Sequence, residues 1–443
     1  MCTPLGFDDL RDPDCIFTPE DEVDRVGKKH LFLLSQVCSN WHYIVMHAAV
    51  LWSVIVVDMT MWKAPPAMLI DLVSTSLARS RDHPLRIEVA SGDEADSCSR
   101  LMLEMIGQHA RRWRHFRLYC ELSSFHFIMT GTKGNLPLLQ TLDVANHGEE
   151  WTELGVFAVA PRLHTVTFQG SDTRIPSVPW HQLRHFDITS ETVNSLALLP
   201  RLPSGASVSV CISWQDPPVD LPPITSPISA LTLVLDYDPP NAFLAQVLGS
   251  LSLPRLTLLA LKSGVYEVDS LLDWNQTQFQ AFAKSHGGLT VLEIEVKIED
   301  VEILECLSLL PVLEQLSVSD CSDGNHTCIT NKFFLGFVWT SQRTCIAPRL
   351  TSICLTSLLA FHETSCQTFV QSRLRPGFPP FTFRLYWIRN KSSSQACPNL
   401  VEDLVEWALD RQNGQLNFVL AESCTYISSG DYSCGQAKST KYL

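Results

Sequence analysis

The chain has 443 residues, of which 45% are hydrophobic and 18% are charged, and its net charge is -14 from 33 Lys+Arg and 47 Asp+Glu. This composition excludes a largely disordered chain. The acidic balance excludes nucleic acid as a main partner, because it would repel a phosphate backbone. The length exceeds that of a single compact core, so we predict either two domains or one elongated repeat array.

Residues 1–30 form an irregular, acidic segment that is interrupted by prolines. They contain no basic region followed by an apolar core, so we predict no secretory signal and a location in the cytoplasm and/or nucleus. The 15 cysteines agree with a reducing compartment, since no Cys-x-x-Cys pair occurs. The Asn-x-Ser/Thr sequons at Asn275, Asn325 and Asn390 are then chance matches.

A helix is expected over 31–47, where Leu34, Val37 and Trp41 recur at helical spacing. The apolar run 43–57 is shorter than the roughly 20 residues that a membrane-spanning helix needs, so we predict no membrane contact. Its last five residues, 53–57, are rich in β-branched side chains and predict a short strand.

A six-residue unit then recurs along the chain, with apolar residues at its first, fourth and sixth positions. Proline often precedes it, which suits the first residue of a strand. The last two apolar positions fall on one face of a strand and should point into the core. Nine units are present: Trp113-Phe116-Leu118, Leu139-Leu142-Val144, Leu163-Val166-Phe168, Leu183-Phe186-Ile188, Ile228-Leu231-Leu233, Leu256-Leu259-Leu261, Leu289-Leu292-Ile294, Leu313-Leu316-Val318 and Leu350-Ile353-Leu355.

Helical periodicity between the units predicts helices at 239–251, 274–284, 298–310 and 365–374. A degenerate tenth unit is expected around Val208-Val210-Ile212. Because one strand–helix unit cannot bury its apolar face alone, the units should stack. We therefore predict an α/β fold, a leucine-rich-repeat solenoid (horseshoe) with its strands on the concave side. An ordinary α/β domain with a parallel sheet is the alternative.

The C-terminal part contains one further amphipathic helix, expected at 400–412, where Leu400, Leu404, Trp407 and Ala408 recur at helical spacing. We expect this helix to close the hydrophobic end of the array. The solenoid with its cap then spans 61–420, and a Ser/Gly-rich flexible tail spans 421–443.

Residues 34–57 (LSQVCSNWHYIVMHAAVLWSVIVV) resemble the second half of an F-box. The segments 77–89 and 106–118 are similar to F-box and leucine-rich-repeat proteins abundant in mushroom-forming fungi, and the resemblance extends from about 31 to 375. A short helical N-terminal F-box-like module is therefore expected at 31–60. Residues 1–30 lack the Leu-Pro opening and the first helix of a full F-box.

The resemblance implies a substrate receptor of an SCF-type cullin–RING ubiquitin ligase, with the F-box on a Skp-type adaptor and the repeats on an unknown protein substrate. It assigns the F-box core or adaptor-binding face to Leu34, Val37, Trp41, Ile44, Leu51 and Trp52. For Val37 and Trp41, a purely structural place in the core is an equally good interpretation.

The partner-binding residues of the repeats should be those that face solvent on the concave strands. The candidates are Gln140, Thr141, Asp143, His164, Thr165, Thr167, His185, Asp187, Glu293, Glu295, Gln315 and Ser317. The alternative function is that of a non-ligase leucine-rich-repeat interaction protein, in which the degraded F-box only caps the solenoid.

No catalytic role is expected, since the sequence contains no nucleophile elbow, phosphate loop, dinucleotide fingerprint, zinc-protease helix or kinase signature. An unrecognised hydrolase on a repeat scaffold is a third possibility. Cys321, His326 and Cys328 lie close together in sequence, but their spacing matches no zinc pattern and a fourth ligand is not evident. We therefore predict neither metal nor cofactor.

Overall fold

The structure of the chain is a computed structural model that divides into two compact units, residues 14–210 and residues 211–443, with the division inside strand β7 (Ser207–Ser213). The N-terminal segment 1–28, with the place expected for a first F-box helix, lies outside the described residues. The structure describes residues 29–59, 66–91, 97–119, 132, 136–145, 155–170, 177–190, 193–213, 221–236, 243–263, 274–320, 327–339, 346–374, 380–388, 398–409 and 416–423.

The first described elements of unit 14–210 are a pair of helices, α2 (Lys29–Val37) and α3 (Ser39–His47), followed by the 3-10 turn η2 (Ala49–Trp52). The single helix predicted over 31–47 is wrong. Cys38 interrupts it with an extended backbone, φ -164° and ψ 169°. The carbonyl of Cys38 accepts the N–H of His42 at 2.9 Å and so begins the second helix.

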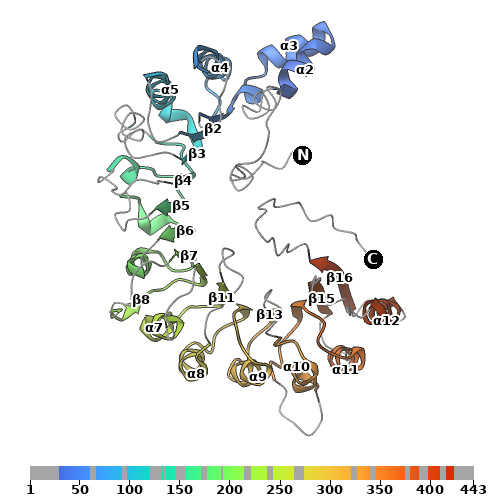
Figure 1. The fold of residues 1–443 in the computed structure, drawn as a ribbon. Helices are drawn as coiled ribbons and strands as arrows, with labels where there is room; N and C mark the ends of the chain where they lie inside the picture. The colour runs from blue at the N-terminus through green and yellow to red at the C-terminus, as the bar shows by residue number, and fades with distance from the viewer. Residues whose placement is uncertain are drawn as a thin grey trace. The chain divides into compact units, whose positions relative to one another are not determined.

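A parallel sheet makes up the rest of unit 14–210, with strands in chain order. The bounds are β1 (Val54–Asp58), β2 (Leu85–Ala90), β3 (Trp113–Tyr119), β4 (Thr141–Ala145), β5 (Thr165–Gly170), β6 (His185–Ser190) and β7. Two helices lie on one side of these strands, α4 (Pro66–Arg79) and α5 (Ser97–Gly107), as Figure 1 shows. The 3-10 turn η3 (Ala110–Arg112) leads from α5 into β3. Between β4 and β7 the described connections are 3-10 helices: η4 (Gly155–Ala158), η5 (Trp180–Gln182) and η6 (Val193–Arg201).

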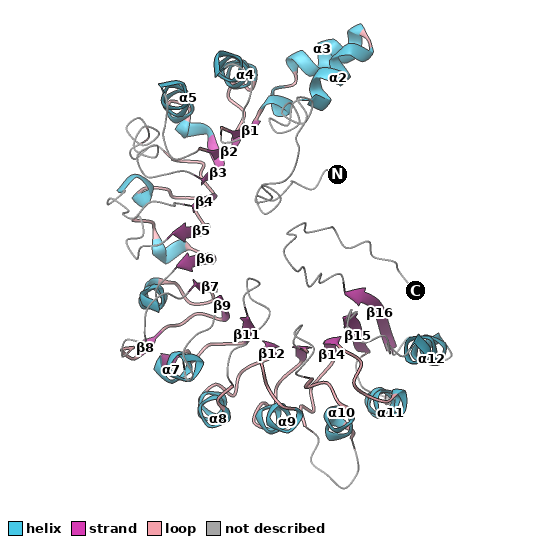
Figure 2. Ribbon diagram, viewed as in Figure 1, coloured by secondary structure: helices cyan, strands magenta, loops and turns pink. Residues whose placement is uncertain are grey.

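Unit 211–443 is a second parallel array, with strand order β9-β11-β12-β13-β14-β15-β16 and a small separate sheet of β8 and β10. Helices alternate with the strands along the chain and lie on one side of them (Figure 2). The bounds are β8 (Ile224–Thr225), β9 (Ala230–Asp236), α7 (Phe243–Ser250), β10 (Leu251–Ser252), β11 (Leu258–Ser263), α8 (Gln276–Ser285), β12 (Val291–Glu295), α9 (Asp300–Ser308), β13 (Gln315–Ser319), α10 (Asn331–Phe337), β14 (Ser352–Ser357), α11 (Glu363–Arg373), β15 (Phe381–Ile388), α12 (Pro398–Leu409) and β16 (Leu416–Ser423).

The core consists of the apolar positions of the repeated units. All three positions of each of the nine predicted units are buried, and none is more than 5% exposed. The strand register places equivalent positions side by side, so that Phe116, Leu142, Val166 and Phe186 form one continuous row. Full burial of each such side chain contributes roughly 2 kcal/mol. The arrangement is a mixed α/β fold with parallel sheets, and it is consistent with a solenoid.

Some repeats are present that the sequence pattern did not reveal. The degenerate unit is confirmed, since Val208, Val210 and Ile212 on β7 are buried. However, β2, β15 and β16 are further strands of the same kind. Helix α12 buries the expected face but precedes β16, which runs to Ser423 and enters the tail predicted at 421–443. Within the described ranges, no helix combines the length and apolarity that crossing a bilayer requires.

Asp320 ties adjacent repeats together where β13 ends. Its side chain is buried, and one carboxylate oxygen accepts the N–H groups of Cys328 and Ile329 at 2.8 and 3.0 Å. The other oxygen accepts the hydroxyl of Ser357 at 2.9 Å and the N–H of Leu358 at 3.0 Å. These charge-assisted bonds join the end of β13 to the end of β14.

Two buried basic side chains fix the helix layer of unit 211–443. The guanidinium of Arg373 donates to the carbonyls of Phe337, Ile346 and Ala347, each at 3.0 Å. The Nε2 atom of His286 accepts the N–H of Leu253 at 2.9 Å. Such bonds satisfy carbonyl and N–H groups that the ends of helices and strands would otherwise leave without partners.

Candidate partner-binding surfaces

The helix pair α2–α3 exposes apolar side chains to solvent. Val37 is 64% exposed, Trp41 44% and Ile44 41%. Leu33, 54% exposed, lies one helical turn before Val37 and therefore on the same side of α2. Trp41 and Ile44 are likewise neighbours on one side of α3. We call these two exposed apolar pairs, Leu33 and Val37 on α2 and Trp41 and Ile44 on α3, together the helix-pair face.

The other residues predicted for adaptor binding, Trp52, Leu34 and Leu51, are buried or partly buried beneath the helix-pair face. Trp52 is 2% exposed, and its indole N–H donates to the carbonyl of Val45 at 2.6 Å. It therefore offers no surface to a partner, which corrects its assignment as an adaptor-binding residue. Leu34 and Leu51 are partly buried and pack against a small cluster formed by Leu31, Val45 and Trp52.

In unit 14–210 the predicted concave residues lie side by side on the polar face of the strands. The register aligns Asp143 with Thr167 and Thr167 with Asp187, and it also aligns Thr141, Thr165 and His185 in a row. All of these side chains are exposed or half-buried, whereas the residues between them are buried. The structure thus brings together Gln140, Thr141, Asp143, His164, Thr165, Thr167, His185 and Asp187 on neighbouring strands.

Asp143 and Asp187 belong to a charged row across this face. Arg117 pairs with Asp143 through Nε and Oδ2 at 2.6 Å. Burial raises the pKa of Asp143, and the charge of Arg117 opposes that rise. Burial likewise raises the pKa of Asp187, opposed by His185. Each carboxylate is therefore costly to bury unless a cation faces it, as Arg117 faces Asp143.

The four predicted residues of unit 211–443 form a smaller group. Glu293 and Ser317 are aligned on β12 and β13, and Glu293 pairs with Lys262 of β11 at 3.0 Å. Glu295 ends β12, and Gln315 begins β13. Glu295 and Gln315 are exposed, and Glu293 and Ser317 are half-buried. These residues belong to a different unit from those at 140–187, so we treat the two faces separately.

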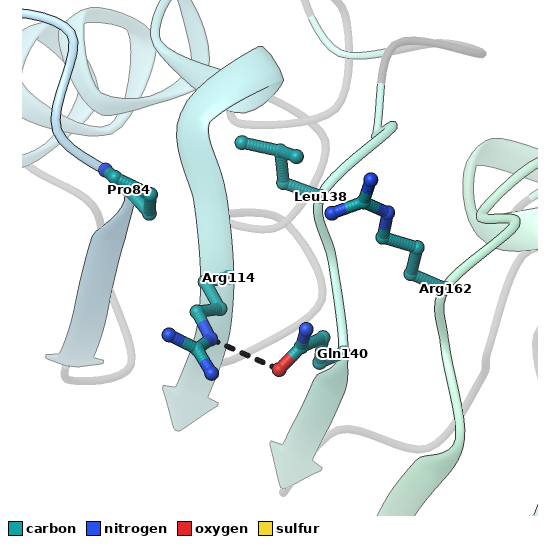
Figure 3. A pocket seen from close by; sticks show the side chains of 5 residues that line it. All are labelled: Pro84, Arg114, Leu138, Gln140 and Arg162. Atoms are coloured by element: carbon teal, nitrogen blue, oxygen red, sulfur yellow. Dashed lines mark hydrogen bonds between the residues drawn. The ribbon is translucent and has the colours of Figure 1, made fainter.

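Arg114 and Arg117 are surface residues that the sequence analysis missed. They occupy the variable positions of the unit Trp113-Phe116-Leu118, where the rule that selected Gln140 and Asp143 would have found them. The guanidinium Nε of Arg114 donates to the side-chain oxygen of Gln140 at 2.9 Å. Figure 3 shows the two side chains in a pocket of about 260 Å³, together with Pro84, Leu138 and Arg162.

In the part of the chain that the structure describes, no group of three or more His, Cys, Asp or Glu side chains could hold a metal ion. Cys321 and His326 lie outside the described ranges. Cys328 is buried, and its N–H donates to Asp320.

The comparisons with known proteins identify no family. No family model and no curated protein matches the sequence. The similar solved structures include a complex of Rad7 and Elc1 in yeast, with 12% identity over 92% of this chain and 97% of that chain and a TM-score of 0.37. A complex of TLR13 with ssRNA13 has 15% identity over 65% of this chain and 45% of that chain, with a TM-score of 0.37. A protein from Bacteroides fragilis has 13% identity over 68% of this chain and 64% of that chain, with a TM-score of 0.27.

Proposed function

We propose that the chain is a protein-binding receptor built on a leucine-rich-repeat solenoid, and specifically a substrate receptor of an SCF-type cullin–RING ubiquitin ligase. In this proposal the helix-pair face binds a Skp-type adaptor, and the polar strand faces hold the protein to be modified. The chain itself performs no chemistry. That last part rests on the absence of catalytic motifs from the sequence.

Adaptor binding is proposed because the apolar helix-pair face is exposed to solvent. A helix pair that served only to cap a repeat array would turn its apolar side toward the strands and its polar side toward water. Val37, Trp41 and Ile44 do the opposite, since between 41% and 64% of their surface is exposed. Exposed apolar patches of this kind mark protein-binding sites, and tryptophan is enriched among the residues that dominate binding energy.

The alternative, an interaction protein whose helix pair only closes the array, also has an observation in its favour. Trp52 is buried beneath the helices, and the guanidinium of Arg79 on α4 lies 4.4 Å from the centroid of its ring system. The pair is therefore attached to the first repeat. Attachment and adaptor binding are compatible, because they use different residues.

The experiment that separates the two functions is a binding titration of the full chain with a purified Skp-type adaptor. The test variant is Trp41→Ala combined with Ile44→Ala. The matched control is Tyr43→Ala, which removes an aromatic ring that is 62% exposed on the other side of the same helix. Loss of a binding-site tryptophan typically costs 2 kcal/mol or more, about a thirtyfold loss of affinity.

We expect the wild type and the Tyr43→Ala control to bind the adaptor with equal affinity and the double variant to bind at least about thirtyfold more weakly. Circular dichroism should show that all three proteins remain folded. If the folded wild type does not bind the adaptor, the ligase assignment fails and the interaction protein with a capping helix pair is favoured.

A further inference from the structure

The segments that lead into strands β2–β7 form a basic edge of unit 14–210. Across 81–84, 109–115, 136–141, 160–165, 178–185 and 199–207 they contain seven arginines and one carboxylate, Asp82. The chain as a whole has 47 acidic against 33 basic residues, so this local excess is opposite in sign to the net charge. Arg114, Arg162 and Arg184 of this edge are exposed.

Backbone hydrogen bonds fix the order of side chains along this edge. The N–H of Gln140 bonds to the carbonyl of Arg114 at 2.8 Å, that of His164 to Gln140 at 3.1 Å, and that of Arg184 to His164 at 2.8 Å. Arg114, Gln140, His164 and Arg184 therefore form one row across four adjacent strands. The pKa of His164 is lowered, mainly by burial and to a smaller extent by the positive charge of Arg184, as expected in a basic environment.

The pocket lies at one end of this row. Arg114 and Arg162 line it on either side of Leu138 and Gln140, and in Figure 3 the guanidinium of Arg162 extends toward Leu138. The bond between Arg114 and Gln140 orients one guanidinium before any ligand arrives. Two guanidinium groups at one pocket suit an oxyanion, because each can donate paired hydrogen bonds to a carboxylate or a phosphate.

The row also has a length that matches an extended peptide. Neighbouring strands lie about 4.8 Å apart, so Arg114 and Arg184 are separated by roughly 14 Å. In an extended segment, side chains four residues apart point the same way and lie about 13 Å apart. Two acidic side chains at this spacing would reach both ends of the row.

We propose that this edge binds an extended acidic segment of a partner protein. One carboxylate or phosphate group binds Arg114 at the β3 side of the pocket, and a second, four residues along the segment, pairs with Arg184. Arg162 lies between these two positions and adds positive charge to the path of the segment. The proposal deepens the proposed function by naming the chemistry that one strand face recognises. It rests on that function only in taking the ligand to be a protein, and it needs no adaptor.

Nucleic acid fits this surface less well. Of the six exposed arginines at this edge, only Arg114 and Arg184 lie in the row, with Arg162 beside it at the pocket. These three are fewer than the six to ten phosphate contacts of a typical nucleic-acid-binding protein. Roughly 10 Å further along the same strands lies the row that contains Arg117, Asp143 and Asp187. There a continuous phosphate backbone would meet two carboxylates and an arginine that is already paired with Asp143. A short acidic peptide with two charged positions avoids that row.

The test uses the full chain and fluorescently labelled peptides in a Gly/Ser background, with binding measured by fluorescence anisotropy. The peptides carry two glutamates, or two phosphoserines, placed two, three or four residues apart, and a peptide with two glutamines is the neutral reference. A labelled oligothymidylate tests the nucleic-acid alternative. The test variant is Arg114→Gln, Arg162→Gln and Arg184→Gln combined.

The matched control removes the same amount of charge elsewhere. It combines Lys284→Gln, Lys297→Gln and Lys332→Gln, all of which are exposed residues of unit 211–443. We expect the four-residue spacing to bind best. The test variant should bind roughly 3- to 150-fold more weakly, since each of three exposed ion pairs contributes about 1.4- to 5-fold in affinity. The lysine variant should bind as the wild type does. The glutamate and phosphoserine peptides show which oxyanion is preferred.

Three results would overturn the proposal: equal binding of the neutral and acidic peptides, equal loss in both triple variants, or tighter binding of the oligothymidylate than of any peptide. Adaptor affinity is measured on the same arginine variant and should not change. A failure of peptide binding with adaptor binding intact removes this inference alone, whereas a failure of adaptor binding by the wild type removes only the ligase assignment.

Discussion

Trp41 and Trp52 lie eleven positions apart in the same apolar stretch, and the structure predicts opposite consequences for their loss. Trp52→Ala removes a ring that is 2% exposed, together with the indole hydrogen bond to Val45 at 2.6 Å. Truncation of a buried aromatic residue typically costs 3–5 kcal/mol, and about 1 kcal/mol of that is expected from the hydrogen bond. Trp41→Ala removes a ring that is already 44% exposed, so we expect it to cost about 1 kcal/mol or less.

The core beneath the helix pair is small, so we expect the loss of Trp52 to open the local structure, whereas the loss of Trp41 should leave it closed. The fully buried residues of the helix-pair cluster are Leu31, Val45 and Trp52. Without Trp52, little apolar contact holds the helices together, so we expect α2 and α3 to open locally while the strands of unit 211–443 stay closed. A loss of 3–5 kcal/mol corresponds to roughly 10²- to 10⁴-fold faster amide exchange where opening is local.

Hydrogen exchange measured by mass spectrometry checks this directly. In Trp52→Ala, peptides that cover 29–47 should lose protection and adaptor binding should fail, whereas peptides from β11 to β14 should exchange at the wild-type rate. In Trp41→Ala, adaptor binding should fail with protection retained. Our assignment of the two tryptophans is refuted if protection of 29–47 survives the loss of Trp52, or if both variants lose it equally.

Three further predictions concern the buried polar groups. Asp320→Ala leaves four donors without their acceptor and should lower the free energy of unfolding by about 3 kcal/mol or more in urea titrations, with Asp320→Glu as the conservative comparison. Arg373→Met retains the aliphatic stem but removes the guanidinium donor from three carbonyls, of which that of Ala347 keeps the N–H of Leu350 at 3.1 Å, so a loss of about 2 kcal/mol or more is expected. An unchanged urea midpoint would contradict the role of the guanidinium. Burial lowers the pKa of His286 in the folded chain, so as the pH falls the unfolded chain takes up the proton before the folded chain does. The neutral, buried imidazole therefore contributes its full stability above about pH 6.5, the pKa of an unfolded histidine. That stability is lost as the pH falls through the pKa of the folded chain. Thermal unfolding from pH 8 to pH 5 should show a shallower pH dependence in His286→Gln than in the wild type.

The strand core could be predicted from the sequence because one spacing rule fixes it. The positions Leu139, Leu142 and Val144 and their equivalents satisfy that rule, and all of them are buried. Strands β15 and β16 were missed because the first apolar position of the unit, three residues before Phe383 and Phe418, is occupied by Pro380 and Gln415 in the sequence. The 3-10 segments between β4 and β7 were also missed, because η4 and η5 are only four and three residues long and η6 contains Pro200.

The division of the helix-pair residues into exposed and buried could not be predicted in the same way. Helical spacing places Leu34, Val37 and Trp41 on one stripe, provided that the helix is continuous. The extended backbone at Cys38 changes the direction of the chain between Val37 and Trp41. After this break Val45 and Trp52 enter the core, while Trp41 faces solvent. A single non-helical residue thus separates two tryptophans that hydrophobicity alone cannot distinguish.

The repeated unit leaves two residues between its first and second apolar positions and one between its second and third. In unit 14–210 the parallel register from β3 to β6 fixes the position of each variable residue on the sheet, because it fixes both its strand and the row of neighbours that it joins. A substitution at one of these positions, for example at Thr167, alters the polar surface without altering the buried rows on the other face. Under the proposed function, point substitutions can therefore change the partner at little cost in stability, because the side chains assigned to partner binding are not those that form the core.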